Sequence, residues 1–373
     1  MRFASMKALV GAVLMIAVFA VAACGGNDNG STTGTGSSTG SAGAGNQKIA
    51  LLLPESKTAR YEALDRPLFE AKLKELCSGC QILYSNADQD ASKQQSQAEA
   101  AITNGAKVLV LDPVDSASAA SIVARAKQSN IPVISYDRLI LNADIDYYVS
   151  FDSIKVGKLQ GESLLKAIGS PQGKSIVMIN GAPTDNNAKL FKQGAHSVLD
   201  PSGVKIAKEY DTPDWSPDKA QTEMEQAITA VGKSNIDGVY AANDGTGGGA
   251  IAAMKGAGID PSKVPVTGQD AELAAVQRIL AGDQYMTVYK PIKPLAEAAA
   301  ELAVAVAQGK QPPSGLVNTK QDNGQKDVPT VGLDVVAVTK DNVKDTIVKD
   351  NVYKTSEICA GQYASACKDA GIQ

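Results

Sequence analysis

The feature that most constrains the fold of this chain is a regular alternation of short apolar runs with longer amphipathic runs, from about residue 48 to about residue 308. The short runs are almost continuously apolar, as in strands that helices cover on both faces of a sheet. This alternation is typical of parallel βαβ units, so we predict an α/β fold. The predicted strands are Lys48–Leu53, Gln81–Asn86, Lys107–Asp112, Pro132–Asp137, Tyr147–Phe151, Ser175–Asn180, Lys205–Tyr210, Gly238–Asn243, Pro265–Gln269 and Tyr285–Tyr289. The predicted helices include Ser92–Asn104, Ala117–Ser129, Ile154–Ile168, Asp218–Val231, Ala271–Ala281 and Pro294–Gln308.

The first 46 residues have a different character from the rest of the chain. Met1–Ala23 carries two basic residues followed by an apolar run, which is typical of a secretory signal. The run ends in Ala22-Ala23-Cys24, which resembles the cleavage and lipidation motif of bacterial lipoproteins, so we expect a lipid on Cys24. An ordinary signal with an incidental cysteine is the alternative. Residues 24–46 are rich in Gly, Ser and Thr and are expected to form a flexible tether.

Length and charge limit the remaining possibilities. Removal of the first 46 residues leaves 373 − 46 = 327 residues, more than the ~250–300 at which a single hydrophobic core stops growing, so we expect two domains. The chain has 36 basic and 40 acidic residues, a formal net charge of −4. Because no basic stripe is present, a nucleic-acid partner has no electrostatic support.

The four cysteines beyond Cys24 fall into two local pairs, Cys77 with Cys80 and Cys359 with Cys367. In an oxidising compartment we expect each pair to form a disulfide. A redox role for the first pair would place its cysteine at a helix N-terminus, whereas this pair ends a helical stretch. A zinc site is the other alternative, but the two pairs lie 359 − 80 = 279 positions apart.

Polar clusters end one predicted strand after another. Open α/β sheets bind ligands at the carboxyl ends of their parallel strands. We therefore expect some of these side chains to face a ligand. Asp115, Asp152 and Asp244 could instead only cap the following helices. The clusters are Asn86-Ala87-Asp88, Asp112-Pro113, Asp137-Arg138, Phe151-Asp152, Asn180-Gly181, Asn243-Asp244, Gln269-Asp270 and Lys290-Pro291.

The sequence gives little support for a catalytic site. The one histidine, His196, lies mid-helix and no Gly-x-Ser-x-Gly elbow occurs, which argues against a Ser-His-Asp hydrolase. The glycines of residues 245–249 lack the spacing of a phosphate-binding loop and are expected to form a tight turn between strand and helix. The single tryptophan, Trp215, lies between polar residues, so it either stacks on a ligand or packs at the surface.

Between about Lys48 and about Ser356 the sequence resembles the D-xylose-binding proteins of bacterial ABC uptake systems, which belong to the ribose/galactose-type periplasmic binding proteins. The segments that carry this resemblance are Tyr136-Asp137-Arg138, Asp144-Ile145-Asp146, Thr184 to Phe191, Ala242-Asn243-Asp244, Gly268 to Ala271 and Thr287 to Ile292.

The resemblance implies two Rossmann-like lobes joined by three hinge crossings. Residues 47–152 would form the N-terminal lobe, completed by about 286–325. Residues 153–285 would form the C-terminal lobe, completed by about 326–357, and residues 358–373 would be a peripheral extension. The two lobes would close on a sugar.

The resemblance also implies the site and the partners. An ABC permease and its ATPase would be the partners of a carrier that needs no metal or organic cofactor and has no catalytic residue. We expect the carrier to be a monomer. The first loop, from Pro54 to Tyr61, departs from the acidic start usual in the family, which leaves the identity of the sugar open. The implied sugar-binding residues are Arg60, Tyr61, Asp137, Arg138, Asn187, Trp215, Asn243, Asp270 and Lys290.

The sequence is also compatible with several alternatives to a xylose carrier. The ligand could be glucose, galactose, arabinose or ribose, and the protein could signal to a membrane receptor. An extracytoplasmic enzyme could use Asp137 and Asp270 as a carboxylate pair, as glycosidases do. A transcriptional repressor with the same core would lack the export signal and would carry a DNA-binding helical motif before Lys48, so it is excluded.

Overall fold

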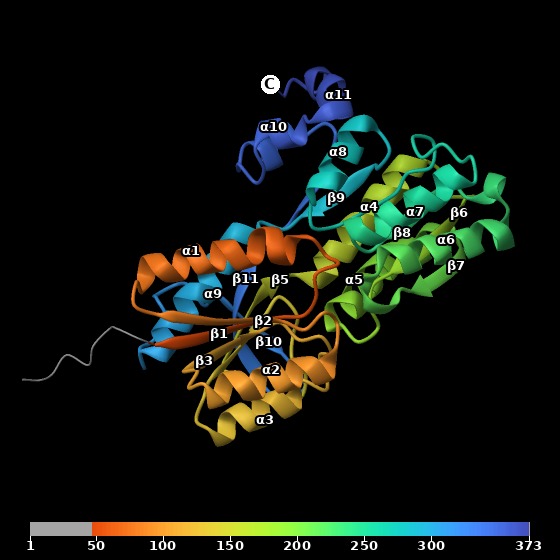
Figure 1. Ribbon diagram of the computed structural model, residues 1–373. Coiled ribbons are helices and arrows are strands. Elements are labelled where there is room, and N and C mark those ends of the chain that lie inside the picture. The colour runs from red at the N-terminus through yellow and green to blue at the C-terminus, as the bar shows by residue number, and fades with distance from the viewer. Residues whose placement is uncertain (1–46, 373) are drawn as a thin grey trace, which may run out of the picture. The chain divides into compact units, whose positions relative to one another are not determined.

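The computed structural model describes residues 47–372 (Figure 1). The predicted signal segment, the lipidation site Cys24 and the tether lie outside the described residues. The strands are β1 Lys48–Leu53, β2 Gln81–Asn86, β3 Val108–Leu111, β4 Val133–Tyr136, β5 Tyr147–Phe151, β6 Ser175–Asn180, β7 Lys205–Asp211, β8 Gly238–Ala241, β9 Met286–Tyr289, β10 Thr319–Asp322, β11 Asp327–Leu333 and β12 Val336–Thr339. The helices are α1 Arg66–Leu76, α2 Ala91–Thr103, α3 Ala120–Gln128, α4 Ser153–Ile168, α5 Asn186–Leu199, α6 Pro217–Val231, α7 Asp244–Gly256, α8 Leu273–Ala281, α9 Ile292–Ala307, α10 Thr355–Ile358 and α11 Ala364–Asp369.

A seven-stranded sheet in the order β10-β11-β5-β4-β3-β1-β2 forms the centre of the first lobe. All neighbours in it are parallel except β10, which is antiparallel to β11. Helices α1 and α9 cover one face, and α2 and α3 cover the other (Figure 1). The almost continuously apolar strands follow from this arrangement, because both faces of the sheet are buried.

The second lobe is built on the parallel order β7-β6-β8 and on the antiparallel pair β9-β12. Helices α4 and α5 pack on one face of β6 and β8, and α6 and α7 pack on the other. The predicted strand Pro265–Gln269 is wrong as a continuous strand. It forms only isolated bridges, from Val266 to Val239 and from Gln269 to Val288, which join the two parts of the sheet.

The chain passes three times between the two lobes, after β5, after β9 and after β11. The α/β fold predicted from the alternation of strands and helices is therefore confirmed, and so are the two lobes implied by the family resemblance. Two predicted lobe boundaries need correction. β9 belongs to the second lobe because it pairs with β12, and β11 belongs to the first because it runs parallel to β5, with Val331 opposite Val149.

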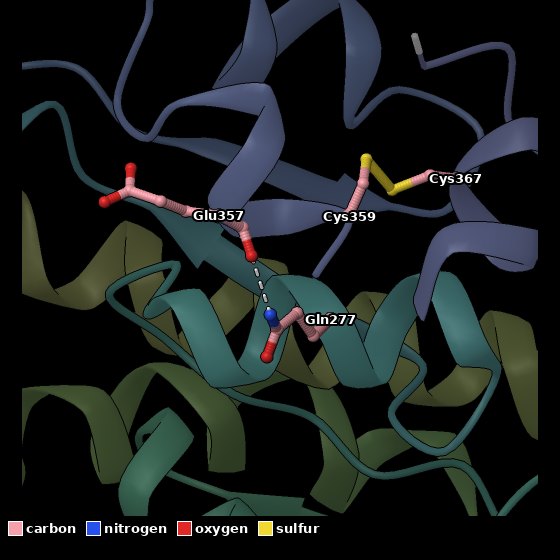
Figure 2. The surroundings of a disulfide bond; sticks show 4 residues. All are labelled: Gln277, Glu357, Cys359 and Cys367. Atoms are coloured by element: carbon pink, nitrogen blue, oxygen red, sulfur yellow. Dashed lines mark hydrogen bonds between the residues drawn. A yellow bond between two sulfur atoms is a disulfide. The ribbon is translucent and has the colours of Figure 1, made fainter. Parts of the chain in front are cut away.

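The C-terminal extension packs on α8 and contains an internal disulfide (Figure 2). Cys359 and Cys367 are bonded, as predicted, and so are Cys77 and Cys80 at the end of α1. The Gln277 side chain on α8 donates to the backbone oxygen of Glu357 at 2.9 Å. The tail thus shares an apolar cluster with α8 and with β12, rather than standing apart as a separate domain.

The glycines at 245–249 do not form the predicted turn, because α7 already begins at Asp244. Gly249 instead allows α7 to pack closely on α6. A Cβ atom at Gly249 would lie 2.2 Å from the backbone oxygen of Pro217, so no larger residue fits there. Within residues 47–372 no helix is both long enough and apolar enough to cross a bilayer.

Candidate functional site

All nine predicted sugar-binding residues lie around one cavity between the lobes. The cavity forms where strand ends of both sheets face each other, which is where α/β sheets bind ligands. Its lining consists of Thr58, Arg60, Tyr61, Asp137, Arg138, Asp185, Asn187, Phe191, Trp215, Asn243, Gln269, Asp270 and Lys290.

Asp137 follows β4 and is the acidic centre of the cavity. Its Oδ2 lies 2.6 Å from Nη2 of Arg60 and accepts from the Tyr61 hydroxyl at 3.2 Å, while its Oδ1 lies 3.7 Å from Nζ of Lys290. Burial alone would raise the pKa of Asp137, but the nearby cations Arg60, Lys290 and Arg138 lower this pKa below its ordinary value. The carboxyl group is therefore ionised and is presented as an acceptor.

The backbone at Asp137 is held in an unusual conformation. Its φ is +54°, in the left-handed region that non-glycine residues rarely adopt. Its carbonyl oxygen accepts from Tyr148 at 2.9 Å, Ser150 at 2.6 Å and Asn187 at 2.9 Å. Two more cavity residues, Trp215 and Asp270, also have positive φ, +52° and +94°. Such strain persists only where surrounding contacts enforce it, and it concentrates at functional sites.

The charged side chains of the cavity neutralise one another. Arg60 lies between Asp137 and Asp270, with its Nε 3.8 Å from Oδ1 of Asp270. Lys290 lies 2.9 Å from Oδ1 of Asp270, across the cavity from the first lobe. Arg138 has its Nε 3.0 Å from Oδ2 of Asp185 in the second lobe. Three cations thus meet three carboxyl groups at the walls.

A second layer of acids lies behind the basic residues. Oδ1 of Asp112 is 3.6 Å and Oε1 of Glu55 is 3.5 Å from the Arg138 guanidinium group, and Asp65 lies 3.7 Å from Nε of Arg60. Burial raises the pKa of Asp65 to about 6, although Arg60 opposes this, and burial also raises the pKa of Asp112 well above its ordinary value. These acids hold the guanidinium groups in position from behind.

Aromatic side chains form part of the wall. The Trp215 indole packs edge-on against Phe191, with ring centroids 6.4 Å apart, and its Nε1 donates to Oδ2 of Asp185 at 3.1 Å. A Cβ atom at Gly181 would lie 2.0 Å from the indole, so glycine is required there. Trp215 is 4% exposed, so it is a wall residue of the cavity and not a surface residue.

Several buried polar atoms of the cavity have no hydrogen-bond partner among residues 47–372. They include Nη1 of Arg60, Oδ1 of Asp137, Oδ1 of Asn187 and Oε1 of Gln269. A buried donor or acceptor left unsatisfied costs about 1–3 kcal/mol. The cavity therefore suits a ligand with both hydroxyl donors and hydroxyl acceptors, and no net charge is needed to balance its walls.

Four lining residues were not among the predicted ones: Thr58, Asp185, Phe191 and Gln269. The sequence did contain signals for three of them. Asp185 and Phe191 lie in the quoted segment from Thr184 to Phe191, and Gln269 belongs to a polar strand end. Thr58 lies in the loop that departs from the family pattern, so neither the resemblance nor a strand end identified it as a site residue.

The three candidate capping acids divide between two roles. Asp115 and Asp152 accept backbone N–H groups at the starts of helical segments, as the capping reading predicts. Asp244 is instead buried, and its carboxyl group accepts from the side chains of Gln284 at 2.8 Å and Thr287 at 2.9 Å. The residue that caps α7 is Asn243. His196 on α5 pairs with Asp200, just beyond the end of α5, and with Glu209 on β7, and it is not part of the cavity lining.

No cluster of His, Cys, Asp and Glu that could hold a metal ion occurs within the part of the chain that the structure describes. The carboxyl groups at the cavity are paired with Arg60, Arg138 and Lys290. They are thus engaged by cations of the protein itself, and the donor set of the cavity favours an uncharged organic ligand.

Comparison with known proteins gives consistent matches. The model of the periplasmic binding protein domain matches residues 49–311. The D-xylose-binding periplasmic protein of Escherichia coli is 42% identical over 315 residues, covering 83% of this chain and 92% of that protein. The multiple sugar-binding periplasmic receptor ChvE of Rhizobium radiobacter is 37% identical over 329 residues, with the same two coverages. A carbohydrate transporter solute-binding protein of Chloroflexus aurantiacus, solved with D-glucose, has a TM-score of 0.75 and 31% identity, covering 84% of this chain and 98% of that one.

Proposed function

The chain belongs to the family of periplasmic binding proteins, and from this premise we propose that it captures a monosaccharide outside the cytoplasm and delivers it to an ABC transporter. The observation that carries the proposal is the cavity between the lobes, whose charged walls are balanced and whose buried polar atoms lack partners. A sugar offers the alternating donors and acceptors that these atoms require.

Xylose is the sugar that we propose first. Two relatives at 42% and 41% identity are named D-xylose-binding periplasmic proteins. Other aldoses are the second candidates, because one relative is named a multiple sugar-binding receptor and one similar structure holds D-glucose. In such a site the ligand hydroxyls accept from Arg60 and Asn243 and donate to Asp137 and Asp270, and Trp215 stacks on the ring.

We propose that binding proceeds by closure of the two lobes about the three crossings, near residues 152, 290 and 334. A sugar that contacts both lobes favours the closed form by the difference between its affinities for the closed and open forms. Closure would create the surface that the permease and its ATPase recognise. A sensory role alongside uptake is supported by the relative that is named a receptor.

The protein is a binding protein and not an enzyme, in keeping with its family and with relatives named as binding proteins. The glycosidase alternative also conflicts with the chemistry of the cavity. A glycosidase acid must keep its proton near neutral pH, whereas the cations around Asp137 lower its pKa. Asp270 is held by Lys290 at 2.9 Å.

We propose that the mature protein is a monomer anchored by a lipid on Cys24 to the outer face of the cytoplasmic membrane. Support for the anchor is the lipobox-like end of the signal segment and the Gly- and Ser-rich stretch that follows it. Mass spectrometry of the protein from membranes tests this. A diacylglycerol adduct on Cys24 is expected, and a mature form that starts at another residue without lipid would refute the anchor.

A calorimetric screen of pentoses and hexoses tests the function. Xylose should bind with one site per chain and should raise the melting temperature, because a ligand at ~100 times its Kd adds ~2.7 kcal/mol to stability. No product should form from aryl glycosides. If no monosaccharide binds, the proposed function is wrong.

A further inference from the structure

Two loops from opposite lobes touch each other beside the cavity. One loop, Val114–Ser116, follows β3 in the first lobe, and the other, Thr184–Asn186, precedes α5 in the second. The backbone N–H of Ser116 donates to the Thr184 carbonyl oxygen at 3.0 Å, and the backbone N–H of Asn186 donates to Oγ of Ser116 at 3.0 Å. The Thr184 hydroxyl donates to the Val114 carbonyl oxygen at 3.4 Å.

Ser116 is the central residue of this contact. It is 1% exposed, and its carbonyl oxygen accepts the backbone N–H of Leu141 within its own lobe at 2.8 Å. The serine is thus fixed in the first lobe and presents one donor and one acceptor to the second. Ser116 is not one of the residues that line the cavity.

In the second lobe, residues of the segment from Thr184 to Asn187 alternate between lining the cavity and contacting the first lobe. Asp185 and Asn187 line the cavity, whereas Thr184 and Asn186 face Ser116 and Val114. The contact with Ser116 therefore fixes the segment from which two cavity residues project.

We propose that Ser116 is a positioning residue that sets sugar affinity: its hydrogen bonds to the second lobe form only when the lobes close, so they stabilise the closed form without touching the ligand. This inference rests on the proposed function. An interaction made in the closed form alone shifts the equilibrium between open and closed protein, and the apparent affinity changes with the fraction that is competent to close.

Replacement of Ser116 by alanine tests the proposal. Ser116→Ala removes the acceptor of the Asn186 N–H, and the loss of one such hydrogen bond should weaken xylose binding roughly 5- to 10-fold. The loss should appear as faster dissociation, because the open form that first meets the sugar lacks this contact. Thr184→Ala, which removes the bond to Val114, should act in the same direction. Stopped-flow Trp215 fluorescence gives both rate constants.

Ser118→Ala is the matched control, because Ser118 lies two residues further along the chain but is exposed, and its hydrogen bonds within residues 47–372 go to Asp115 and Ser121 of its own lobe. It should bind as the wild type does. Circular dichroism and the melting temperature show whether each variant is folded. If the wild type binds xylose and both Ser116→Ala and Thr184→Ala release it at the rate of Ser118→Ala, the positioning role is wrong. If the wild type binds no monosaccharide, the proposed function fails first and the role of Ser116 fails with it.

Discussion

Replacement of Asp137 by asparagine should weaken sugar binding about 100-fold while leaving the fold intact. The change keeps the size of the side chain but removes the charge that faces Arg60 at 2.6 Å and Lys290 at 3.7 Å. Removal of one partner of a buried ion pair costs about 3–5 kcal/mol. The lower end applies here, because Asp270 remains within 3.8 Å of Arg60 and within 2.9 Å of Lys290. About 3 kcal/mol corresponds to roughly 100-fold in Kd.

The cost should fall on binding more than on global stability. In an open form the cavity is hydrated, so the unpaired cations meet water there and lose it only on closure. Calorimetry with xylose measures the affinity, and thermal unfolding without sugar measures the stability. Asp88→Asn is the matched control, since Asp88 also has a positive φ, +50°, but is exposed on the β2–α2 loop. A Kd for Asp137→Asn within threefold of the control would refute the role of this carboxylate.

Further predictions concern the tryptophan, a buried acid and the cysteines. Because Trp215 is the one tryptophan and lines the cavity, saturating xylose should change the intrinsic fluorescence, and an unchanged spectrum would remove Trp215 from the site. Trp215→Phe should weaken binding about 5- to 10-fold through loss of its bond to Asp185. Burial raises the pKa of Glu272 to about 8, with Asp244 and Asp270 adding to the effect. The folded protein therefore keeps a proton that the unfolded chain releases near pH 4.5. Stability should fall as pH rises from about 4.5 to about 8, and thermal melts of Glu272→Gln should show a weaker fall; an unchanged slope would contradict this. A thiol titration of the unfolded mature protein should find no free cysteine before reduction, whereas four free thiols would refute both disulfides.

Most of the fold could be predicted from the sequence because the parallel strands are buried on both faces. The predicted strands Lys48–Leu53 and Ser175–Asn180, for example, have the observed bounds of β1 and β6. β10 was missed because its four residues, Thr319–Asp322, are all exposed and polar and give no apolar signal. The predicted lobe boundaries near residues 286 and 326 failed for another reason, since the pairing partners of β9 and β11, which lie far apart in sequence, decide them.

The candidate site was predictable in a different way. Position at a strand end identified Asp137, Asn243 and Asp270 as candidates on physical grounds, whereas Arg60 and Asn187 came only from the family resemblance. The sequence could not separate Asp152, a helix cap, from Asp137, a cavity residue, since both follow strands. What distinguishes them is which side of the loop faces the other lobe, and that depends on contacts such as the one between Asn187 and the Asp137 carbonyl oxygen.

The pairing of three cations with three carboxyl groups around the cavity has a consequence for the environment in which the protein works. A cavity with balanced walls exerts little long-range attraction on an uncharged ligand, so dissolved salt has little to screen. Capture should therefore proceed at nearly the same rate in dilute and in saline surroundings. If the protein works outside the cytoplasm as proposed, in a medium that the cell does not control, uptake would then follow the supply of sugar and not the ionic strength outside.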